Sequence, residues 1–308
     1  SLYESFVKTN RSISALIRYD ENKSKKIQNK KKVTINKKKQ KSICAIIGSG
    51  IFSNEILIPN LLRIPHLCEL DYLCVKKPVS AINLTKQNKN IKVITDYNEI
   101  LSDKNIDTIF ISTRHNLHYE IIKESIKHKK NIFVEKPMCI KPEELKSLKK
   151  IIAKNPSQII VTGFNRRFSK SAKIMREFVE SSNDGVFIDY VINADLIPCS
   201  SWVYGKEGGG RNIGEACHFY DLLSFIIQKD IKSFNAISMS GENNKNNQKT
   251  DNFVVVIKFS DGSVAKITYV TKGPKNSFKE IIEIRSNKEL LLMKNFQFIQ
   301  LYRNNQVD

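Results

Sequence analysis

The 308-residue chain lacks any long apolar run, so the sequence gives no sign of a membrane-spanning helix. Its first residues also lack the apolar core of a secretory signal peptide, and we therefore expect a cytoplasmic protein without a membrane partner. The six cysteines form no CxxC pair and no zinc-ligand spacing. This pattern favours reduced, buried thiols, and we expect neither disulfides nor a metal site.

Acidic residues are few: 31 Asp and Glu stand against 51 Lys and Arg, which gives a formal net charge of +20. About half of the excess comes from one lysine-rich run between Lys23 and Lys41. The interleaved aromatic residues typical of a single-strand nucleic-acid surface are missing. We therefore expect no specific nucleic-acid partner, only a weak, general attraction to polyanions.

The length and the 41% hydrophobic content are sufficient for two globular domains. Residues 1–40 form a leader, in which Ile13–Ile17 is a short apolar stretch and Asp20–Gln40 is a Lys/Asn-rich linker. Such a linker buries too little apolar surface to fold alone. The domains are therefore expected at 41–162 and 163–308.

Residues 41–162 alternate short apolar runs with segments of helical character, such as His118–His128 and Glu143–Lys154. Continuous apolar runs are typical of strands that are buried on both faces, and alternation with helices is typical of a parallel sheet. The expected strands are Ile43–Ile47, Leu70–Val75, Thr108–Ile111, Ile132–Val134 and Ile159–Val161. We predict a doubly wound, Rossmann-type α/β domain.

Residues 163–308 have an α+β pattern, with helices expected at Ser169–Ser181 and Glu215–Gln228. The expected strands are Val186–Ala194, Phe234–Ser240, Asn252–Phe259, Val264–Val270 and Phe278–Arg285. Asp261-Gly262 is a hairpin signal, and the polar stretch Asn243–Lys249 is typical of an exposed loop. Strands that follow one another in this way predict a largely antiparallel, open sheet with one face covered.

Gly48-Ser49-Gly50 follows the first expected strand and opens a helix. In that context a glycine turn lets the backbone and the helix N-terminus approach a pyrophosphate. In the dinucleotide-binding pattern G-x-G-x-x-G/A, the third small residue is usually Gly or Ala, and here Ser53 stands at that position. The alternative interpretation is therefore a plain tight turn. After the second strand, Lys76 and Lys77 replace the acid that usually binds the ribose of NAD. This exchange leaves the cofactor open between NAD and NADP, with a slight preference for NADP.

Glu135-Lys136-Pro137 directly follows another expected strand of the parallel sheet. Open α/β sheets bind ligands at the carboxyl ends of their strands. A lysine there can hydrogen-bond a substrate hydroxyl or carbonyl and stabilise oxyanion character. The alternative is an ordinary surface lysine.

Three glycines, Gly208 to Gly210, run into an apolar helix that carries His218. Three successive glycines indicate a tight turn or a close approach to a ligand. Glu215 and Asp221 lie three residues to either side of His218, so they are candidate partners on or near one helical face. An imidazole among carboxylates can exchange protons near neutral pH. The alternative is a hydrogen-bonded histidine in the core.

Taken together, these motifs resemble the oxidoreductase family named for glucose-fructose oxidoreductase, inositol dehydrogenase and a rhizopine-catabolism protein. The resemblance covers roughly Lys41 to Tyr302 and depends on the order and spacing of Glu135-Lys136-Pro137 and the stretch from Gly208 to Asp221. Within the family, the chain is most similar to a module fused behind a zinc-type alcohol dehydrogenase. Ser1–Tyr19 would then be a remnant of that partner.

The resemblance implies a sugar, sugar derivative or cyclitol as substrate, with hydride passing to or from a nicotinamide cofactor. Glu135 would approach the nicotinamide ribose, Lys136 would touch the substrate hydroxyl and His218 would exchange its proton. The cofactor-binding residues would be Gly48, Gly50, Ile51, Phe52, Lys76, Thr113, His115, His118 and Glu135. The substrate residues would be Arg166, Trp202 and Arg211. The open sheet of the second domain would form a homo-oligomer interface.

The chain departs from the family pattern at three places, of which Gly214 and the short C-terminus favour a second hypothesis, whereas the presence of both Lys136 and His218 opposes it. Gly214 stands where many members carry an acid, four residues before the histidine. The usual Thr-Pro-Asn loop reads Thr113-Arg114-His115, and the chain stops near Asp308 without the closing helix of most relatives. A non-catalytic NAD(P)-binding regulator or assembly partner of the same fold is therefore the alternative.

Overall fold

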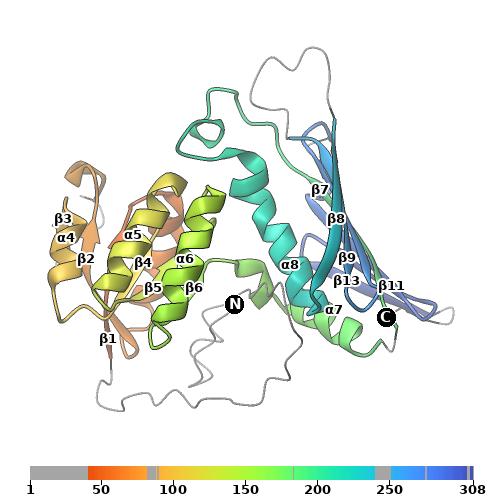
Figure 1. The fold of residues 1–308 in the computed structure, drawn as a ribbon, viewed down its shortest axis with the longest axis horizontal. Coiled ribbons are helices and arrows are strands. Elements are labelled where there is room, and N and C mark those ends of the chain that lie inside the picture. Colours follow the sequence, from red (N-terminus) through yellow and green to blue (C-terminus); the bar gives the residue numbers. More distant parts are fainter. Residues whose placement is uncertain are drawn as a thin grey trace. The chain divides into compact units, whose positions relative to one another are not determined.

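The computed structural model describes residues 41–81, 88, 90–182, 184–239, 251–274, 276–303 and 306–307 (Figure 1). The leader at 1–40 and the loop expected at 243–249 lie outside these residues. The chain divides into two compact units, one ending at Gly163 and the other beginning at Phe164. In the part of the chain that is described, no helix has the length and apolar character needed to cross a membrane.

The first unit is built on a parallel sheet of six strands. The strands are β1 (Ser42–Ile47), β2 (Cys68–Cys74), β3 (Lys92–Ile94), β4 (Thr108–Ile111), β5 (Asn131–Val134) and β6 (Ile160–Thr162). Their order is β3-β2-β1-β4-β5-β6, and every neighbouring pair is parallel. This is the Rossmann order, so the predicted doubly wound fold is confirmed. The short strand β3 is an addition that the sequence pattern did not reveal.

Helices cover both faces of this sheet because the strands are apolar on both sides. The helices are α2 (Ile58–Leu62), α4 (Tyr97–Ser102), α5 (His115–Lys127) and α6 (Pro142–Lys154). Alternate residues of β1 point to opposite faces, as a pleated strand requires. Ala45 and Ile47 belong to the core that α4, α5 and α6 complete, whereas Cys44 and Ile46 belong to the core beneath α2.

The second unit contains an eight-stranded sheet with the order β14-β13-β12-β11-β7-β10-β9-β8. Its strands are β7 (Phe187–Asn193), β8 (Ile231–Ser238), β9 (Phe253–Phe259), β10 (Val264–Val270), β11 (Glu280–Ser286), β12 (Glu289–Lys294), β13 (Phe298–Arg303) and β14 (Gln306–Val307). All pairs are antiparallel except β7 with β10. The predicted antiparallel sheet is confirmed, while β12 to β14 are additional.

Turn residues place the strand ends of this sheet. Asp261-Gly262 connects β9 to β10 as predicted, and Gly262 takes the positive φ of 93° that such a turn favours. Before β12, Asn287 and Lys288 both have positive φ. Neither residue is glycine, so the sequence carries a weaker signal for this second hairpin, and the prediction missed it.

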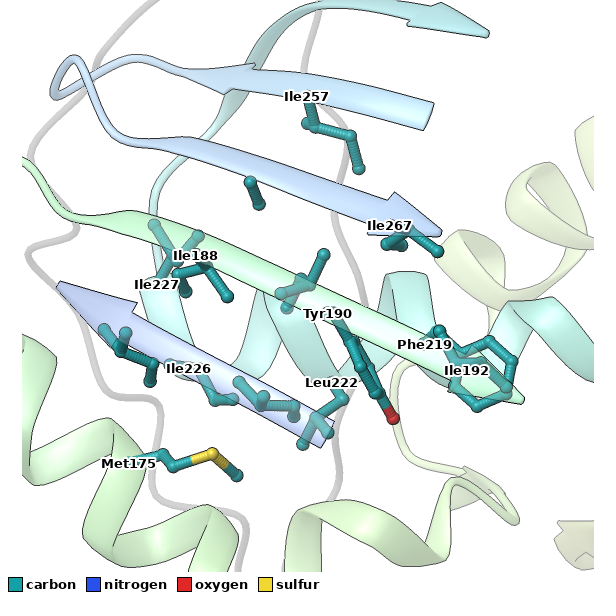
Figure 2. Packing of buried hydrophobic residues seen from close by; sticks show 14 of the residues in the cluster. Met175, Ile188, Tyr190, Ile192, Phe219, Leu222, Ile226, Ile227, Ile257 and Ile267 are labelled. Carbon is teal, nitrogen blue, oxygen red and sulfur yellow. The ribbon is translucent and has the colours of Figure 1, made fainter. Parts of the chain in front are cut away.

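Helices α7 (Lys170–Glu180) and α8 (Cys217–Ile227) cover one face of the second sheet (Figure 1). Tyr190 of β7 packs edge-to-face on Phe219 of α8, with ring centroids 5.3 Å apart (Figure 2). Met175 of α7 and Leu222 of α8 belong to the same buried core. The opposite face of the sheet is only partly buried within the unit, because no helix of the described residues packs on it.

Candidate functional site

The glycine turn after β1 is shaped by its contact with the end of β4. Gly48 has φ of +108°, and a Cβ atom there would lie 2.7 Å from the backbone carbon and oxygen of Ser112. Any larger residue would therefore be excluded on both conformational and steric grounds. At Gly50, by contrast, a Cβ would meet only Ser112 O at 3.9 Å. The contacts within the fold therefore leave space for a side chain at position 50.

Ser53, which interrupts the usual fingerprint, is fully buried and holds the turn together. Its hydroxyl oxygen lies 2.9 Å from Gly48 O, and Ser112 Oγ lies 3.2 Å from the same carbonyl. The two hydroxyls also contact each other, so one of them donates to Gly48 O and the other donates to its neighbour's oxygen. Ser53 thus occupies the close-packed position of the third small residue, with its polar atom satisfied. Sequence reasoning identified it only as a departure from the pattern.

The helix that follows begins at Ile51 and passes through a π-helical turn, Ser53–Leu57. Ile51 is 76% exposed although it is a large apolar residue, and Phe52 is half-buried. Lys76 and Lys77 follow the buried Val75 and are both exposed at the end of β2. Their contacts with a cofactor stay predictions, and the two lysines follow the second strand, where the ribose-binding acid of NAD enzymes is usual.

His118, which the resemblance assigns to the cofactor site, is buried in the structure. Its Nδ1 lies 2.7 Å from Pro137 O and its Nε2 lies 3.2 Å from Thr113 O. Its side chain has no exposed surface, because the first turns of α5 cover it. Burial lowers the pKa of His118, and the two carbonyls oppose that shift. His118 therefore links the loop after β4 to the loop after β5.

Thr113 and His115 follow the end of β4, and their contact with a cofactor stays a prediction. Both are half-buried at the start of α5, and the ring of His115 packs against that of His118 with centroids 5.9 Å apart. Thr113 Oγ1 donates to Arg114 O at 3.3 Å.

Glu135 and Lys136 follow β5 at the same edge. The backbone N–H of Glu135 donates to Ile111 O at 2.8 Å, which places Glu135 beside the end of β4. No described residue donates a hydrogen bond to its buried Oε1. Burial raises the pKa of Glu135 to about 7, and the charge and backbone N–H of Lys136 oppose that shift. Lys136 is half-buried.

In the second unit, His218 lies in the first turn of α8 and is 7% exposed. The ring of Phe164 meets its imidazole edge-on, with centroids 6.1 Å apart. A π-helical turn, Asn212–Ala216, directly precedes it. Turns of this kind are rare and are frequent at functional sites; one follows the Gly48–Gly50 turn and the other lies within the Gly208–Asp221 stretch.

The triple glycine forms a tight turn, as its composition suggested. A Cβ on Gly208 would lie 2.3 Å from Val203 O, while Gly209 and Gly210 have φ of 75° and 82°. This turn brings the segment of Trp202 close to the start of the π-helical turn. Trp202 itself is half-buried in a short 3-10 helix, Trp202–Tyr204.

The carboxylate of Glu215 forms its hydrogen bonds and ion pairs with Tyr269, Arg211 and Lys279. Tyr269 donates to its Oε2 at 2.7 Å and Arg211 Nη2 donates to the same oxygen at 2.8 Å, while Lys279 Nζ lies 3.5 Å from Oε1. Burial alone would raise the pKa of Glu215, but these hydrogen bonds and charges lower it to about 2. Glu215 is therefore an anion over the ordinary pH range and holds Arg211.

Arg211 and Arg166, assigned to the substrate from the resemblance, both have their guanidinium groups engaged inside the unit. Arg211 is buried and also donates to Asp195 O at 2.5 Å. Arg166 donates to both oxygens of Glu280, at 2.9 and 2.5 Å. These contacts connect loops to the sheet. Both guanidinium groups therefore have partners within the unit, and a contact with substrate stays a prediction.

Asp221, the second candidate partner of His218, forms a bidentate ion pair with Arg167. Arg167 Nε donates to Oδ2 at 2.6 Å and Nη2 donates to Oδ1. Asp221 is 2% exposed, so this pair anchors the segment Asn165–Phe168 to α8. The three-residue spacing around His218 therefore does not create a carboxylate pair, because each carboxylate finds an arginine instead. In the described residues, no group of three or more His, Cys, Asp or Glu could hold a metal ion.

Comparison with known proteins agrees with this architecture. Residues 43–163 match the model of an oxidoreductase family with an NAD-binding Rossmann fold, and residues 190–285 match that family's C-terminal alpha/beta domain. The chain belongs to the Gfo/Idh/MocA family of oxidoreductases. The resemblance inferred from Glu135-Lys136-Pro137 and from the Gly208–Asp221 stretch is thus confirmed.

Individual relatives are distant. The uncharacterized oxidoreductase YrbE of Bacillus subtilis is 28% identical over 229 residues, which is 73% of this chain and 66% of that protein. Myo-inositol 2-dehydrogenase of Thermotoga maritima is 28% identical over 182 residues, 57% of this chain and 53% of that enzyme. A levoglucosan dehydrogenase solved with NADH has a TM-score of 0.72 at 18% identity, covering 87% of this chain and 79% of that one. The chain thus spans about half to two thirds of the length of these curated relatives.

Two features of the first unit fit a dinucleotide. The backbone around Gly50 is open where a side chain would stand, and the buried Oε1 of Glu135 lacks a donor among the described residues. The two features lie at the carboxyl ends of β1 and β5, strands that β4 separates. Gly48 and Gly50 would hold the pyrophosphate, Lys76 would face the ribose of the adenosine half, and Glu135 would face the ribose of the nicotinamide half.

Proposed function

We propose that this protein is an NAD(P)-dependent oxidoreductase that transfers a hydride between a nicotinamide cofactor and a sugar, sugar derivative or cyclitol. The observation that carries the proposal is Lys136 at the carboxyl end of β5, in the sheet whose β1 ends in the Gly48–Gly50 turn. A hydroxyl- or carbonyl-bearing substrate beside Lys136 would lie next to the cofactor half that carries the hydride. Curated relatives of the chain include a myo-inositol dehydrogenase, which supports a polyol substrate.

Each residue has a definite chemical task in this proposal. The cofactor supplies hydride chemistry when bound. Lys136 hydrogen-bonds the substrate oxygen and stabilises negative charge that develops on it. His218 takes a proton from the substrate hydroxyl in oxidation and returns one in reduction. Gly214 carries no carboxylate, and the carboxylate of Glu215 is held by Arg211 and Tyr269.

The test is a screen of the purified protein against a panel of sugars and cyclitols, with NAD and NADP in both oxidation states, following nicotinamide absorbance. Turnover with at least one polyol is expected. The exposed Lys76 and Lys77 favour NADP, and Lys76→Asp should shift the preference toward NAD. Cofactor binding without turnover on any compound would favour the alternative, a non-catalytic regulator. Failure to bind either cofactor would contradict both hypotheses.

A prediction about cofactor binding separates the two glycines of the turn. Gly50→Val should fold like the wild type, because a Cβ there meets only Ser112 O at 3.9 Å. Its cofactor affinity should fall at least about tenfold, since the side chain would stand where the pyrophosphate approaches. Gly48→Ala should instead lower the melting temperature, owing to its positive φ and its 2.7 Å contact with Ser112. Fluorescence titration and thermal unfolding measure both effects. Equal cofactor affinities of Gly50→Val and wild type would disprove the pyrophosphate assignment.

We further propose that the protein forms a homo-oligomer through the open face of the second sheet. On this face lie apolar residues with unusually large exposure, among them Phe187 at 46%, Val256 at 41% and Phe298 at 58%. Ile237 of β8 is 70% exposed and lies opposite Val254 of β9. Large exposed apolar patches mark interaction surfaces.

The variant Ile237→Asp/Val256→Asp should therefore dissociate the oligomer, as measured by sedimentation or light scattering. Charges on two neighbouring strands would have to be buried in the interface, which is costly. Leu145→Asp on α6 is the matched control, because Leu145 is an exposed apolar residue of the first unit, and it should leave the mass unchanged. A monomeric wild type would refute this proposal.

A further inference from the structure

The side chain of Glu135 occupies a space beside Gly163, the residue that follows the neighbouring strand β6. Glu135 follows β5, and Gly163 follows β6, so the two positions are neighbours at the sheet edge. A Cβ atom on Gly163 would lie 2.6 Å from Glu135 Oε1. A side chain at position 163 would therefore displace this carboxyl group from its present position. Sequence reasoning singled out Glu135 but missed Gly163, because no pattern links a glycine to a side chain 28 positions away.

The carboxyl group is unusual because one of its oxygens is buried without a donor among the described residues. Buried polar atoms are nearly always hydrogen-bonded, and an unsatisfied one asks for an explanation such as a ligand. Burial also disfavours the ionised form, which is why the pKa of Glu135 lies at about 7. Near neutral pH the group is thus divided between its acid and its anion.

Its place in the sheet determines which part of a dinucleotide it would meet. In the order β3-β2-β1-β4-β5-β6, the adenylate half binds over β1 and β2 and the nicotinamide half over β4 to β6. Glu135, at the end of β5, belongs to the nicotinamide half. The oxidised nicotinamide ring carries a positive charge, whereas the reduced ring is neutral. A buried carboxyl group responds strongly to such a difference, since interactions between charges strengthen away from water.

We propose that Glu135 is a proton-linked ligand of the nicotinamide half, which loses its proton when oxidised cofactor binds and keeps it when reduced cofactor binds. This inference rests on the proposed cofactor-dependent function. In the binding step, protonated protein and oxidised cofactor give the complex with an ionised Glu135 and one proton released to solvent. No electron is transferred. Proton release thereby couples the affinity for oxidised cofactor, but not for reduced cofactor, to pH.

Among the described residues, two titratable groups lie close enough to affect the protonation of Glu135. Lys136, from its own strand end, favours the anion. From β4 the contact is the backbone of Ile111, and from β6 it is Gly163; neither titrates. From α5, His118 lies beside the same loop through Pro137 O. Its pKa is lowered by burial, so His118 is the group whose proton uptake must be separated from that of Glu135.

Calorimetric titration in buffers of different ionisation enthalpy counts the protons released on binding. The probes are NAD+ and NADH, or NADP+ and NADPH if the protein prefers them. For the wild type, oxidised cofactor should release close to one proton at pH 6, and its affinity should rise about tenfold per pH unit below pH 7 and level off above it. Reduced cofactor should release none. The variant Glu135→Gln should abolish the proton release, whereas Glu99→Gln, at an exposed position on α4, should retain it.

Infrared difference spectra of the wild type provide a second readout that needs no variant. Addition of oxidised cofactor should remove a protonated-carboxyl band, and addition of reduced cofactor should not. Equal proton release with both cofactors, or undiminished release in Glu135→Gln, would overturn the proposal and point to His118 or another group. A wild type that binds neither cofactor would instead contradict the proposed function itself, so the two failures are distinguishable.

Discussion

Lys136→Met is expected to bind cofactor like the wild type and to lose turnover by about 10²-fold or more. Methionine keeps the length of the side chain but removes the ammonium group, so the substrate oxygen loses its hydrogen-bond donor and its electrostatic stabilisation. Because this interaction strengthens as charge develops, kcat should fall more than KM rises. Steady-state kinetics on the substrate found by the screen, with cofactor titration as a check of folding, measures the effect.

His218→Asn should give a loss of similar size, about 10²- to 10⁴-fold, because the exchanged proton then has no acceptor of suitable pKa. If Lys136 and His218 act on the same substrate oxygen, the double variant should be only slightly worse than the weaker single variant, as groups that act as a unit are not additive. Lys104→Met and His128→Asn, at exposed positions, are the matched controls. If Lys136→Met kept the turnover of the wild type, Lys136 would not stabilise the substrate oxygen and the proposed mechanism would be wrong.

Arg167→Met is expected to destabilise the second unit by about 3–5 kcal/mol, because it leaves Asp221 buried without its partner. Asp221 is 2% exposed and both of its oxygens accept hydrogen bonds from Arg167. Removing the buried charge as well, in Arg167→Met/Asp221→Leu, should restore much of the loss. Urea unfolding followed by the fluorescence of Trp202, which lies in this unit, reports the change.

Arg176→Met provides the control, since Arg176 pairs with Glu180 one helical turn away on an exposed face of α7. Exposed pairs of this kind contribute about 0.3–0.5 kcal/mol. Similar losses for Arg167→Met and Arg176→Met would show that the Arg167–Asp221 pair does not anchor Asn165–Phe168 to α8.

Much of the fold could be predicted because its strands and turns depend on short stretches of sequence. Continuous apolar runs predicted β1, β2, β4, β5 and β6, because strands of a parallel sheet are buried on both faces. Asp261-Gly262 predicted its hairpin because the turn needs a residue that accepts positive φ. The hairpin before β12 escaped prediction, since Asn287 and Lys288 adopt positive φ without a glycine to announce it.

By itself, the sequence determined the two-part architecture, the family and the positions of the chemical motifs, all of which depend on short-range patterns and spacing. Only the tertiary structure decided what each polar side chain contacts. In the structure, His118 is buried between two backbone carbonyls. Asp221 pairs with Arg167, and Glu215 pairs with Arg211. Gly163 lies beside Glu135. Arg211 and Glu215 are only four positions apart, but Asp221 and Arg167 are 54 positions apart, and Glu135 and Gly163 follow two neighbouring strands of the sheet. A buried charge must find a partner wherever packing brings one, and no local pattern encodes that choice.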